Sequence, residues 1–316
     1  MKKRKIGNTD IEIAPLIFGG NVFGWTANEE TSFRLLDDFF DKGFNTIDTA
    51  NSYSSWVPGN KGGESETIIG KWLKQTGKRD QAVIITKVGW DITPERKGLD
   101  KRSIIEEVEG SLKRLQTDYI DIYLAHKDDP KMPVEETLEA FDKLIKQGKV
   151  RQIGASNFYK DRLIESIKTS REKKLYEYKV IQPKYNLFDR LFEKGEAAVA
   201  EEYGLGVITY SSLASGFLSG KYRTEKDFTK SDRGHGMQKY LNEKGFAILQ
   251  ALEKISKKHA AAYSTIALAW LLHKPTVTAP IASATSSEQL NELMAAVSLN
   301  LSEEDMKMLD GAGEGS

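Results

Sequence analysis

The chain has 316 residues, of which 39% are hydrophobic, and its 46 Lys+Arg balance its 46 Asp+Glu. This composition supports a folded core, and zero net charge gives no reason to expect a nucleic acid or an anionic membrane as partner. The absence of cysteine rules out disulfides and thiolate metal sites. Four histidines are too few to favour a multi-histidine metal centre, so we expect no metal. No apolar run approaches the roughly 20 residues of a membrane span, and the basic N-terminus leads into no signal core. We therefore expect a soluble, cytoplasmic protein.

The apolar pattern predicts a short hairpin over residues 2–13 and then strands that alternate with helices. Eight strands are predicted, at 15–19, 44–48, 82–88, 119–125, 150–155, 179–184, 205–211 and 277–283. Helices are predicted at 29–42, 64–76, 102–115, 135–147, 160–170, 193–203, 242–273, 286–297 and 303–311. Pro183 and Pro280 fall within the sixth and eighth strands, where we interpret them as strand ends or bulges because proline has no N–H to donate.

Strands that alternate with helices are typical of parallel βαβ units. Eight such units without a linker favour a closed (β/α)8 barrel, a TIM barrel, as one domain over residues 1–316. The one long stretch without a clear pattern is 221–241, after the seventh strand. Loops of this length are usually functional lids or disordered, and as a lid this one would close over bound cofactor through Arg223, Arg233 and His235.

Four polar residues stand at or just beyond the ends of neighbouring predicted strands. Asp48 ends the second strand and Tyr53 follows five residues later, Lys87 ends the third strand, and His126 follows the fourth. Each of these residues alone is more often structural than catalytic. Functional groups of such barrels collect at the carboxyl ends of the strands, so their joint placement predicts an active site.

Proton transfer from a tyrosine is the chemistry that these residue types suggest. A phenol has an ordinary pKa of about 10, and a nearby cation lowers that pKa because it favours the phenolate. We expect Lys87 to be this cation, Asp48 to pair with Lys87, and His126 to hydrogen-bond to a substrate carbonyl oxygen. The electron pair would come most naturally as a hydride from a nicotinamide cofactor.

In order and spacing, Asp48, Tyr53, Lys87 and His126 resemble the catalytic tetrad of the aldo-keto reductases, nearest to the bacterial-type branch. The resemblance extends over nearly the whole chain. It implies an NAD(P)H-dependent oxidoreductase that reduces aldehydes, ketones or sugars to alcohols, with Tyr53 as general acid.

The same resemblance implies the cofactor contacts. Ser156, Asn157 and Gln182 would hold the nicotinamide carboxamide, Tyr210 would stack on the nicotinamide ring, and Asp48 would lie beside it. The remaining contacts would come from the loops after the first, seventh and eighth strands, at Gly20, Asn21, Val22, Ser211, Leu213, Ala214, Gly216, Leu218, Lys221, Ala282, Ser283, Ala284, Thr285, Ser286, Gln289 and Glu292. No G-x-G-x-x-G follows a strand, which argues against a Rossmann module.

The choice between the two nicotinamide cofactors depends on the loop after the eighth strand. Many relatives carry Arg or Lys near positions 285 and 286, whereas this chain has the hydroxyls of Thr285 and Ser286, and Leu293 stands where an Asn is frequent. Hydroxyls and the free N–H groups of a helix start can still bind a phosphate. We expect NADP(H), with NAD(H) as the alternative.

Aromatic residues that follow four of the strands are candidates for the substrate pocket. Trp25, Trp56, Trp90 and Phe158, together with Tyr53 and His126, could clasp a small carbonyl substrate or a sugar ring. One or two of these rings could instead pack between loops. Nothing in the sequence specifies the number of subunits.

Two other classes of function compete with the reductase. The first is a non-enzymatic redox sensor that binds the nucleotide, as in the potassium-channel β subunits of the same family. The second is a barrel glycosidase, which would need a pair of carboxylates at strand ends, whereas Asp48 stands beside a lysine.

Overall fold

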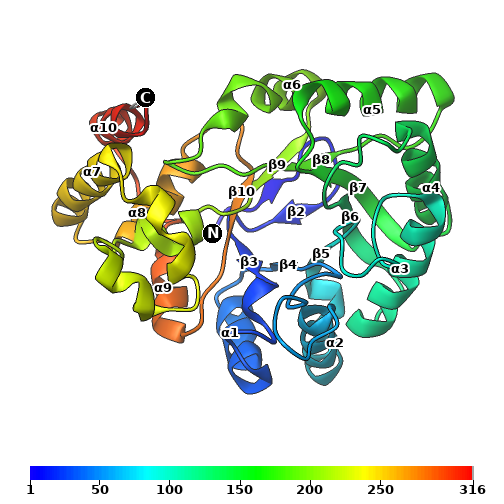
Figure 1. The fold of residues 1–316 in the computed structure, drawn as a ribbon, viewed down its shortest axis with the longest axis horizontal. Coiled ribbons are helices and arrows are strands. Elements are labelled where there is room, and N and C mark those ends of the chain that lie inside the picture. Colours follow the sequence, from blue (N-terminus) through cyan, green and yellow to red (C-terminus); the bar gives the residue numbers. More distant parts are fainter. Residues whose placement is uncertain (315–316) are drawn as a thin grey trace.

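The computed structural model describes residues 1–314, apart from the side chain of His235. Its centre is a closed barrel of parallel strands in the order β10-β3-β4-β5-β6-β7-β8-β9 (Figure 1). The strands are β3 (Ile17–Gly19), β4 (Thr46–Asp48), β5 (Val83–Val88), β6 (Ile120–Ala125), β7 (Val150–Ser156), β8 (Val180–Gln182), β9 (Gly206–Thr209) and β10 (Ala279–Ala282). The predicted (β/α)8 barrel is confirmed.

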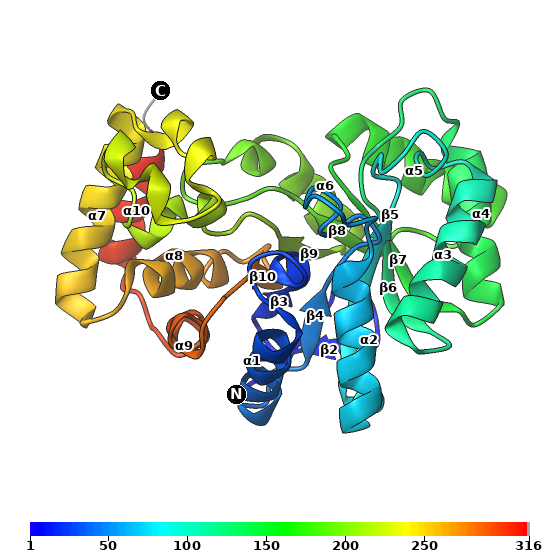
Figure 2. The ribbon, with the colours of Figure 1, turned by 60° about the horizontal axis from the view of Figure 1, so that its bottom comes forward.

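Helices surround this barrel and cover the outer faces of its strands (Figures 1 and 2). They are α1 (Glu29–Asp41), α2 (Glu64–Thr76), α3 (Lys101–Leu115), α4 (Val134–Lys146), α5 (Lys160–Lys173), α6 (Glu196–Tyr203), α7 (Glu243–His259), α8 (Tyr263–Leu272), α9 (Ser287–Ala295) and α10 (Glu303–Gly313). The terminal helix α10 packs on α7, at the left of both views. No helix within residues 1–314 has both the length and the apolar character needed to cross a membrane.

The predicted hairpin is also present, with β1 (Arg4–Lys5) antiparallel to β2 (Glu12–Ile13). In Figure 1 it crosses the centre of the ring of strands. Its isoleucines belong to the cluster of side chains that fills the barrel, which contains Ile6, Ile11, Ile13, Ile17, Val83, Ile85, Ile122, Leu124, Val180, Ile208, Ala279 and Ile281. The hairpin therefore closes the end of the barrel at which the strands begin.

Two sequence predictions about local structure need correction. The helix predicted over 242–273 is two helices, because α7 ends at His259, the next residue Ala260 has a left-handed φ of 48°, and α8 begins at Tyr263. The segment 221–241 contains short 3-10 helices at Glu225–Lys230, Gly234–Gly236 and Gln238–Tyr240. Pro183 lies just beyond β8, as predicted, whereas Pro280 lies inside β10 and pairs with Thr209, so the strand end or bulge expected there is not found.

Candidate active site

The rows of side chains that point into the barrel end in polar groups at the carboxyl ends of the strands. Side chains alternate between the two faces of a strand. Val83 and Ile85 fill the barrel, so Lys87 continues their row, and His126 continues the row of Ile122 and Leu124. Asp48 and Gln182 end the corresponding rows of β4 and β8. The alternation within each strand therefore directs these side chains into one space.

Lys87 is the centre of the polar cluster and is fully buried. Its Nζ donates to Asp48 Oδ2 at 2.8 Å, to the Tyr53 hydroxyl at 2.8 Å and to the carbonyl oxygen of Thr49 at 2.7 Å. The Tyr53 hydroxyl in turn donates to Asp48 Oδ2 at 3.1 Å, and Gln182 Nε2 donates to Asp48 Oδ1 at 2.8 Å. The predicted triad of Asp48, Tyr53 and Lys87 is thus one hydrogen-bonded unit.

His126 lies on the open side of this unit. Its ring centroid is 6.0 Å from that of Tyr53 and 5.0 Å from that of Trp90, and Nδ1 lies 3.5 Å from Ser52 Oγ. Burial, with a smaller contribution from the charge of Lys87, holds the pKa of His126 well below its usual 6.5. The imidazole is therefore neutral at neutral pH.

The pKa of Tyr53 differs from the sequence expectation. Burial, and then the carboxylate of Asp48, raise the pKa of Tyr53 well above 10, although the charge of Arg233 lowers it. Burial also lowers the pKa of Lys87, which the neighbouring carboxylate of Asp48 partly restores. The phenol is consequently protonated at neutral pH, the form that an acid requires, and the hydrogen bond from Lys87 is available to a phenolate once the proton has left.

A second, outer layer of charges supports the cluster, and it was missed in the sequence. Glu66 on α2 is fully buried; it accepts from Thr86 Oγ1 at 2.6 Å and from Arg114 Nε at 2.7 Å. Its charge helps to raise the pKa of Lys87. The signal was present, because Glu66 occupies the apolar stripe of α2 with Ile69 and Leu73 at i+3 and i+7.

The residues assigned to the nicotinamide end lie together beside Asp48. Ser156 Oγ donates to the Gln182 carbonyl at 2.9 Å, and the Tyr210 hydroxyl donates to Asn157 Oδ1 at 2.6 Å. Asn157 Nδ2 donates to the His126 carbonyl at 2.8 Å. These contacts connect β6, β7, β8 and the residue after β9 at one rim.

Backbone conformation tests whether this rim suits a phosphate-bearing nucleotide. Eight non-glycine residues in the described part of the chain have a positive φ. Three of them are the C-caps of helices: Gln116, Lys174 and Ala260. The other five follow β4, β7 and β9, at Ser54, Asn157, Ser211, Ala214 and Ser215. Backbone held in this conformation collects at ligand sites, and successive turned N–H groups form concave anion sites. Gly216 (φ 100°) continues the run, and a Cβ there would lie 3.7 Å from Lys221 Cε. The loop fits a pyrophosphate.

Several residues assigned to the adenosine end form hydrogen bonds within the protein. Ser283 Oγ donates to Asn21 Oδ1 at 2.5 Å, Ser286 caps α9, and Gln289 Oε1 accepts from Thr285 N at 3.0 Å. Glu292 Oε2 accepts from Ser264 Oγ on α8 at 2.9 Å. The other assigned residues with buried side chains could contact a nucleotide only through their backbone atoms. They are Val22, Ala214, Leu218, Ala282 and Ala284.

Three tryptophans form a rim around Tyr53 and His126. Trp56 lies 6.3 Å from Tyr53 and edge-on to Trp25 at 5.5 Å between ring centroids, and Trp56 and Trp90 are 49% and 44% exposed. The prediction for Phe158 is not supported, because its ring is buried in the main core and lies 5.9 Å from Tyr178. The rim therefore comes from the loops after β3, β4 and β5.

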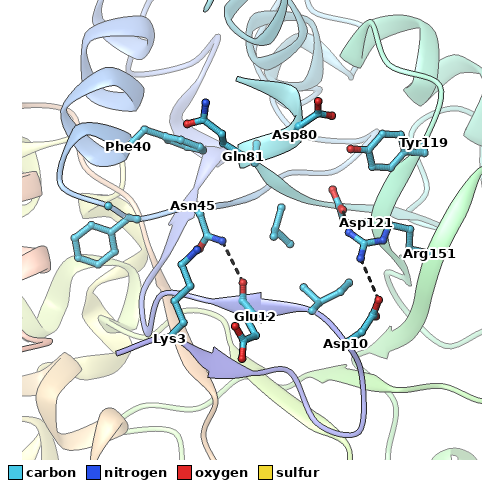
Figure 3. A pocket seen from close by; sticks show the side chains of 15 residues that line it. Lys3, Asp10, Glu12, Phe40, Asn45, Asp80, Gln81, Tyr119, Asp121 and Arg151 are labelled. Atoms are coloured by element: carbon cyan, nitrogen blue, oxygen red, sulfur yellow. Dashed lines mark hydrogen bonds and ion pairs between the residues drawn. The ribbon is translucent and has the colours of Figure 1, made fainter. Parts of the chain in front are cut away.

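A separate polar cavity of about 440 Å³ lies at the other end of the barrel, between the hairpin and the strand starts (Figure 3). Asp121 projects into it from β6 and pairs with Arg79 at 2.9 Å and Arg151 at 2.7 Å. Arg151 also contacts Asp10 of the hairpin turn at 3.3 Å. These charges pair with one another, and the catalytic end of such barrels is the opposite one, so we assign this cavity a structural role.

The comparisons with known proteins identify the class of oxidoreductase to which this barrel belongs. The model of the Aldo/keto reductase family matches residues 15–314. The chain therefore belongs to the aldo/keto reductase family.

Similar proteins cover nearly the whole chain. The "Uncharacterized oxidoreductase YrpG" of Bacillus subtilis is 35% identical over 98% of this chain and 95% of its own length. The "Aldo-keto reductase YhdN" of the same organism is 35% identical over 97% of this chain and 92% of its own length. A "Probable voltage-gated potassium channel subunit beta" of Oryza sativa subsp. japonica is 31% identical over 94% and 91%.

Proposed function

We propose that this aldo/keto reductase reduces aldehydes or ketones to alcohols with NADPH or NADH, and that Tyr53 is the general acid. The observation that carries the proposal is the buried Lys87, whose Nζ lies 2.8 Å from both the Tyr53 hydroxyl and the Asp48 carboxylate. A buried lysine at a barrel rim costs free energy unless its charge is used, and here it donates to the phenol of Tyr53.

Each residue has a distinct part in the proposed reaction. The nicotinamide, when bound, supplies the hydride that the carbonyl carbon receives. As the carbonyl π bond breaks, Tyr53 gives its proton to the oxygen, and the new O–H bond completes the alcohol. Lys87 stabilises the phenolate that remains, and Asp48 keeps Lys87 charged and oriented.

Neutral His126 positions the carbonyl. A neutral imidazole carries one N–H, and with Nδ1 facing Ser52 Oγ, the tautomer protonated at Nε2 is the one that can donate to a carbonyl oxygen. An uncharged donor also avoids placing a second cation beside Lys87. The three tryptophans would exclude water from the reacting bond.

The test is a fluorescence titration with NADPH and NADH, followed by steady-state reduction of aldehydes, methylglyoxal and sugars. We expect both nucleotides to bind, and NADPH to bind no more than about tenfold tighter, because no Arg or Lys lies within 282–292 to pair with a 2′-phosphate. Protein that binds neither nucleotide would refute the proposal.

A nucleotide sensor without turnover is the second candidate, because one relative bears the name of a potassium channel β subunit. Such a protein binds a nicotinamide nucleotide and reduces nothing. The two candidates separate in the same experiment: tight nucleotide binding with turnover of no carbonyl compound in the panel favours the sensor. The proposed reductase oxidises bound NADPH when an aldehyde is added.

A further inference from the structure

Two loops at the mouth of the proposed active site carry most of its aromatic rim. The loop 49–63, between β4 and α2, contains Tyr53 and Trp56, and the loop 89–100, between β5 and α3, contains Trp90. Both loops lie within the described residues, and neither forms a helix or a strand of the barrel. The two tryptophans are nearly half exposed, so the packing of their rings does not by itself fix either loop. Polar contacts of the loops therefore decide where the rim lies.

A single carboxylate on α3 contacts both loops. From the first loop, Asn51 Nδ2 donates to Glu107 Oε2 at 2.8 Å. From the second loop, Arg96 donates through Nε to Glu107 Oε1 at 2.6 Å and through Nη2 to Oε2 at 3.0 Å. Arg96 Nη1 also donates to the carbonyl oxygen of Lys61, in the first loop, at 2.9 Å. Glu107, Arg96 and Asn51 thus form a clamp that joins the two loops to each other and to α3.

The geometry of this clamp leaves little freedom. A guanidinium that donates two hydrogen bonds to one carboxylate fixes the plane of both groups as well as their distance. The side chain of Glu107 is only 13% exposed. Burial alone would raise the pKa of Glu107, but the hydrogen bonds from Arg96 and Asn51 outweigh it and hold that pKa below its usual range. The carboxylate is therefore ionised at neutral pH, with both oxygens used in the clamp.

The first loop is anchored close to the residues that face the site. Asn51 lies two residues before Tyr53, and its backbone N–H donates to the carbonyl oxygen of Lys87 at 3.3 Å. Its Oδ1 is buried and has no hydrogen-bond partner within residues 1–314. The hydrogen bond from Nδ2 to Glu107 is therefore the contact that orients the Asn51 side chain and, with it, the start of the loop.

The second loop is anchored in a similar way. The backbone N–H of Ile92 donates to the Arg96 carbonyl at 2.9 Å, and the Arg96 N–H donates to the Thr93 carbonyl at 3.1 Å. These bonds close a turn that begins two residues after Trp90. A displacement of Arg96 would therefore be carried to the Trp90 ring.

We propose that Glu107 is a positioning residue for substrate binding, which sets the separation of the two loops and thereby the places of Trp56 and Trp90 beside the substrate. This inference rests on the proposed reductase activity. The Tyr53 hydroxyl has its own hydrogen bond from Lys87 at 2.8 Å, so loss of the clamp loosens the rim and leaves the proton donor in place. Contacts that hold substrate and transition state equally affect KM and not kcat.

The competing explanation is an ion pair that only stabilises the packing of α3. The two explanations differ in the kinetics of the folded protein. Breaking a merely structural pair lowers the free energy of unfolding and leaves KM unchanged at temperatures well below the unfolding transition. Breaking the clamp raises KM at those same temperatures.

The kinetic experiment measures kcat and KM for 4-nitrobenzaldehyde at saturating NADPH, well below the unfolding temperature of every variant. In Glu107→Gln and in Arg96→Met, KM should rise at least about fivefold while kcat stays within about threefold of the wild type. The double variant should have a KM within about twofold of the worse single variant, because the two side chains act as one unit.

Glu106→Gln is the matched control. It removes the neighbouring carboxylate on the same helix, whose ion pair of 2.7 Å is made with Arg102 of α3 and is exposed. Its KM and kcat should stay within about twofold of the wild type, as expected for an exposed pair on a helix surface.

Quenching of tryptophan fluorescence by acrylamide tests the clamp without any substrate. Trp72 and Trp270 are fully buried, so quenching reports mainly on the three tryptophans of the rim. Glu107→Gln and Arg96→Met should both be quenched more strongly than the wild type, and Glu106→Gln should not.

Two results would overturn the inference. The first is an unchanged KM in folded Glu107→Gln and Arg96→Met, even if both are less stable. The second is a fall in kcat at constant KM, which would show that the clamp acts on Tyr53 instead of the rim. A wild type that reduces no aldehyde would refute the proposed function, and the quenching experiment would still show whether Glu107 holds the loops.

Discussion

At the scale of single residues, the site is a column of alternating charges that extends from the rim into the space between barrel and helices. Asp48 pairs with Lys87, and behind β5 the buried Glu66 pairs with Arg114. Burial lowers the pKa of Lys87, while the charges of Asp48 and Glu66 raise it. In the proposed mechanism only a protonated Lys87 stabilises the phenolate, so we expect both carboxylates to affect the rate.

We predict that Glu66→Gln moves the alkaline limb of the pH profile of kcat to lower pH. Without this carboxylate the pKa of Lys87 falls further, so Lys87 loses its proton, and the enzyme its rate, at a lower pH. Glu107→Gln is the control, because Glu107 lies near the same Arg114 (3.9 Å) yet is not among the charges that shift Lys87. An alkaline limb that stays in place in Glu66→Gln would contradict this role, whatever happens to stability.

At the scale of elements, the strand ends were predictable and the outer helices less so. Apolar β-type runs located Asp48 and Lys87 from the sequence alone as the residues that end two strands, and the alternation of side chains along each strand turns both of them into the barrel. The break between α7 and α8 was not predicted, because Ala260 and Ala261 favour helix, whereas Ala260 has a left-handed φ in the structure and both α8 and α10 pack on α7. The helix propensity of these two alanines therefore does not determine the backbone conformation at this corner.

The corner is held by Asp305, the third residue of α10. Its carboxylate caps α10 together with Ser302 and accepts from Lys258 at 2.8 Å and His259 at 2.9 Å. Burial alone would raise the pKa of Asp305, but the hydrogen bonds from Lys258, His259 and Ser302 outweigh it and hold that pKa below its usual range. A lowered folded-state pKa stabilises the fold fully above the unfolded pKa of about 3.9, and this stabilisation is lost progressively as the pH falls from there through the lowered pKa of the folded state.

We predict that Asp305→Asn lowers the free energy of unfolding at pH 7 by about 1–3 kcal/mol, and that the difference from wild type shrinks towards pH 3. Urea denaturation at both pH values measures it. The exposed neighbour Glu304 provides the control, and Glu304→Gln should cost less than about 0.5 kcal/mol. A deficit of equal size at pH 3 and pH 7 would show that charge is not the cause.

At the scale of the whole molecule, the residues proposed for catalysis and the ion pairs assigned a structural role lie at opposite ends of the barrel. The proposed catalytic cluster lies where the strands end, and the hairpin with the ion pairs of Asp121 lies where they begin (Figure 3). The sequence allowed the barrel, the hairpin and the cluster to be predicted because each depends on strand periodicity. The positions of Arg233 and Phe158 depend on how loops pack, and periodicity says nothing about loops.

This separation predicts the behaviour of Asp121→Asn. The variant removes a buried carboxylate from two arginines, one of them partly exposed, and should lower the free energy of unfolding by about 2–4 kcal/mol. Its kcat at temperatures where it remains folded should equal that of the wild type, because the change lies at the far end of the barrel. Asp10→Asn, which removes only the exposed contact to Arg151, should cost less than about 1 kcal/mol. A lower kcat in folded Asp121→Asn would show that the two ends are coupled.

The proposed mechanism depends on one hydroxyl group, and Tyr53→Phe removes that group alone. We would measure turnover of the best aldehyde together with the Kd for NADPH, with Tyr159→Phe, at a tyrosine that is 80% exposed, as control. The account predicts that kcat falls by about 10²–10⁴-fold in Tyr53→Phe while the Kd for NADPH stays within about twofold and the control keeps its activity. A Tyr53→Phe variant that reduces the aldehyde at the wild-type rate would contradict it.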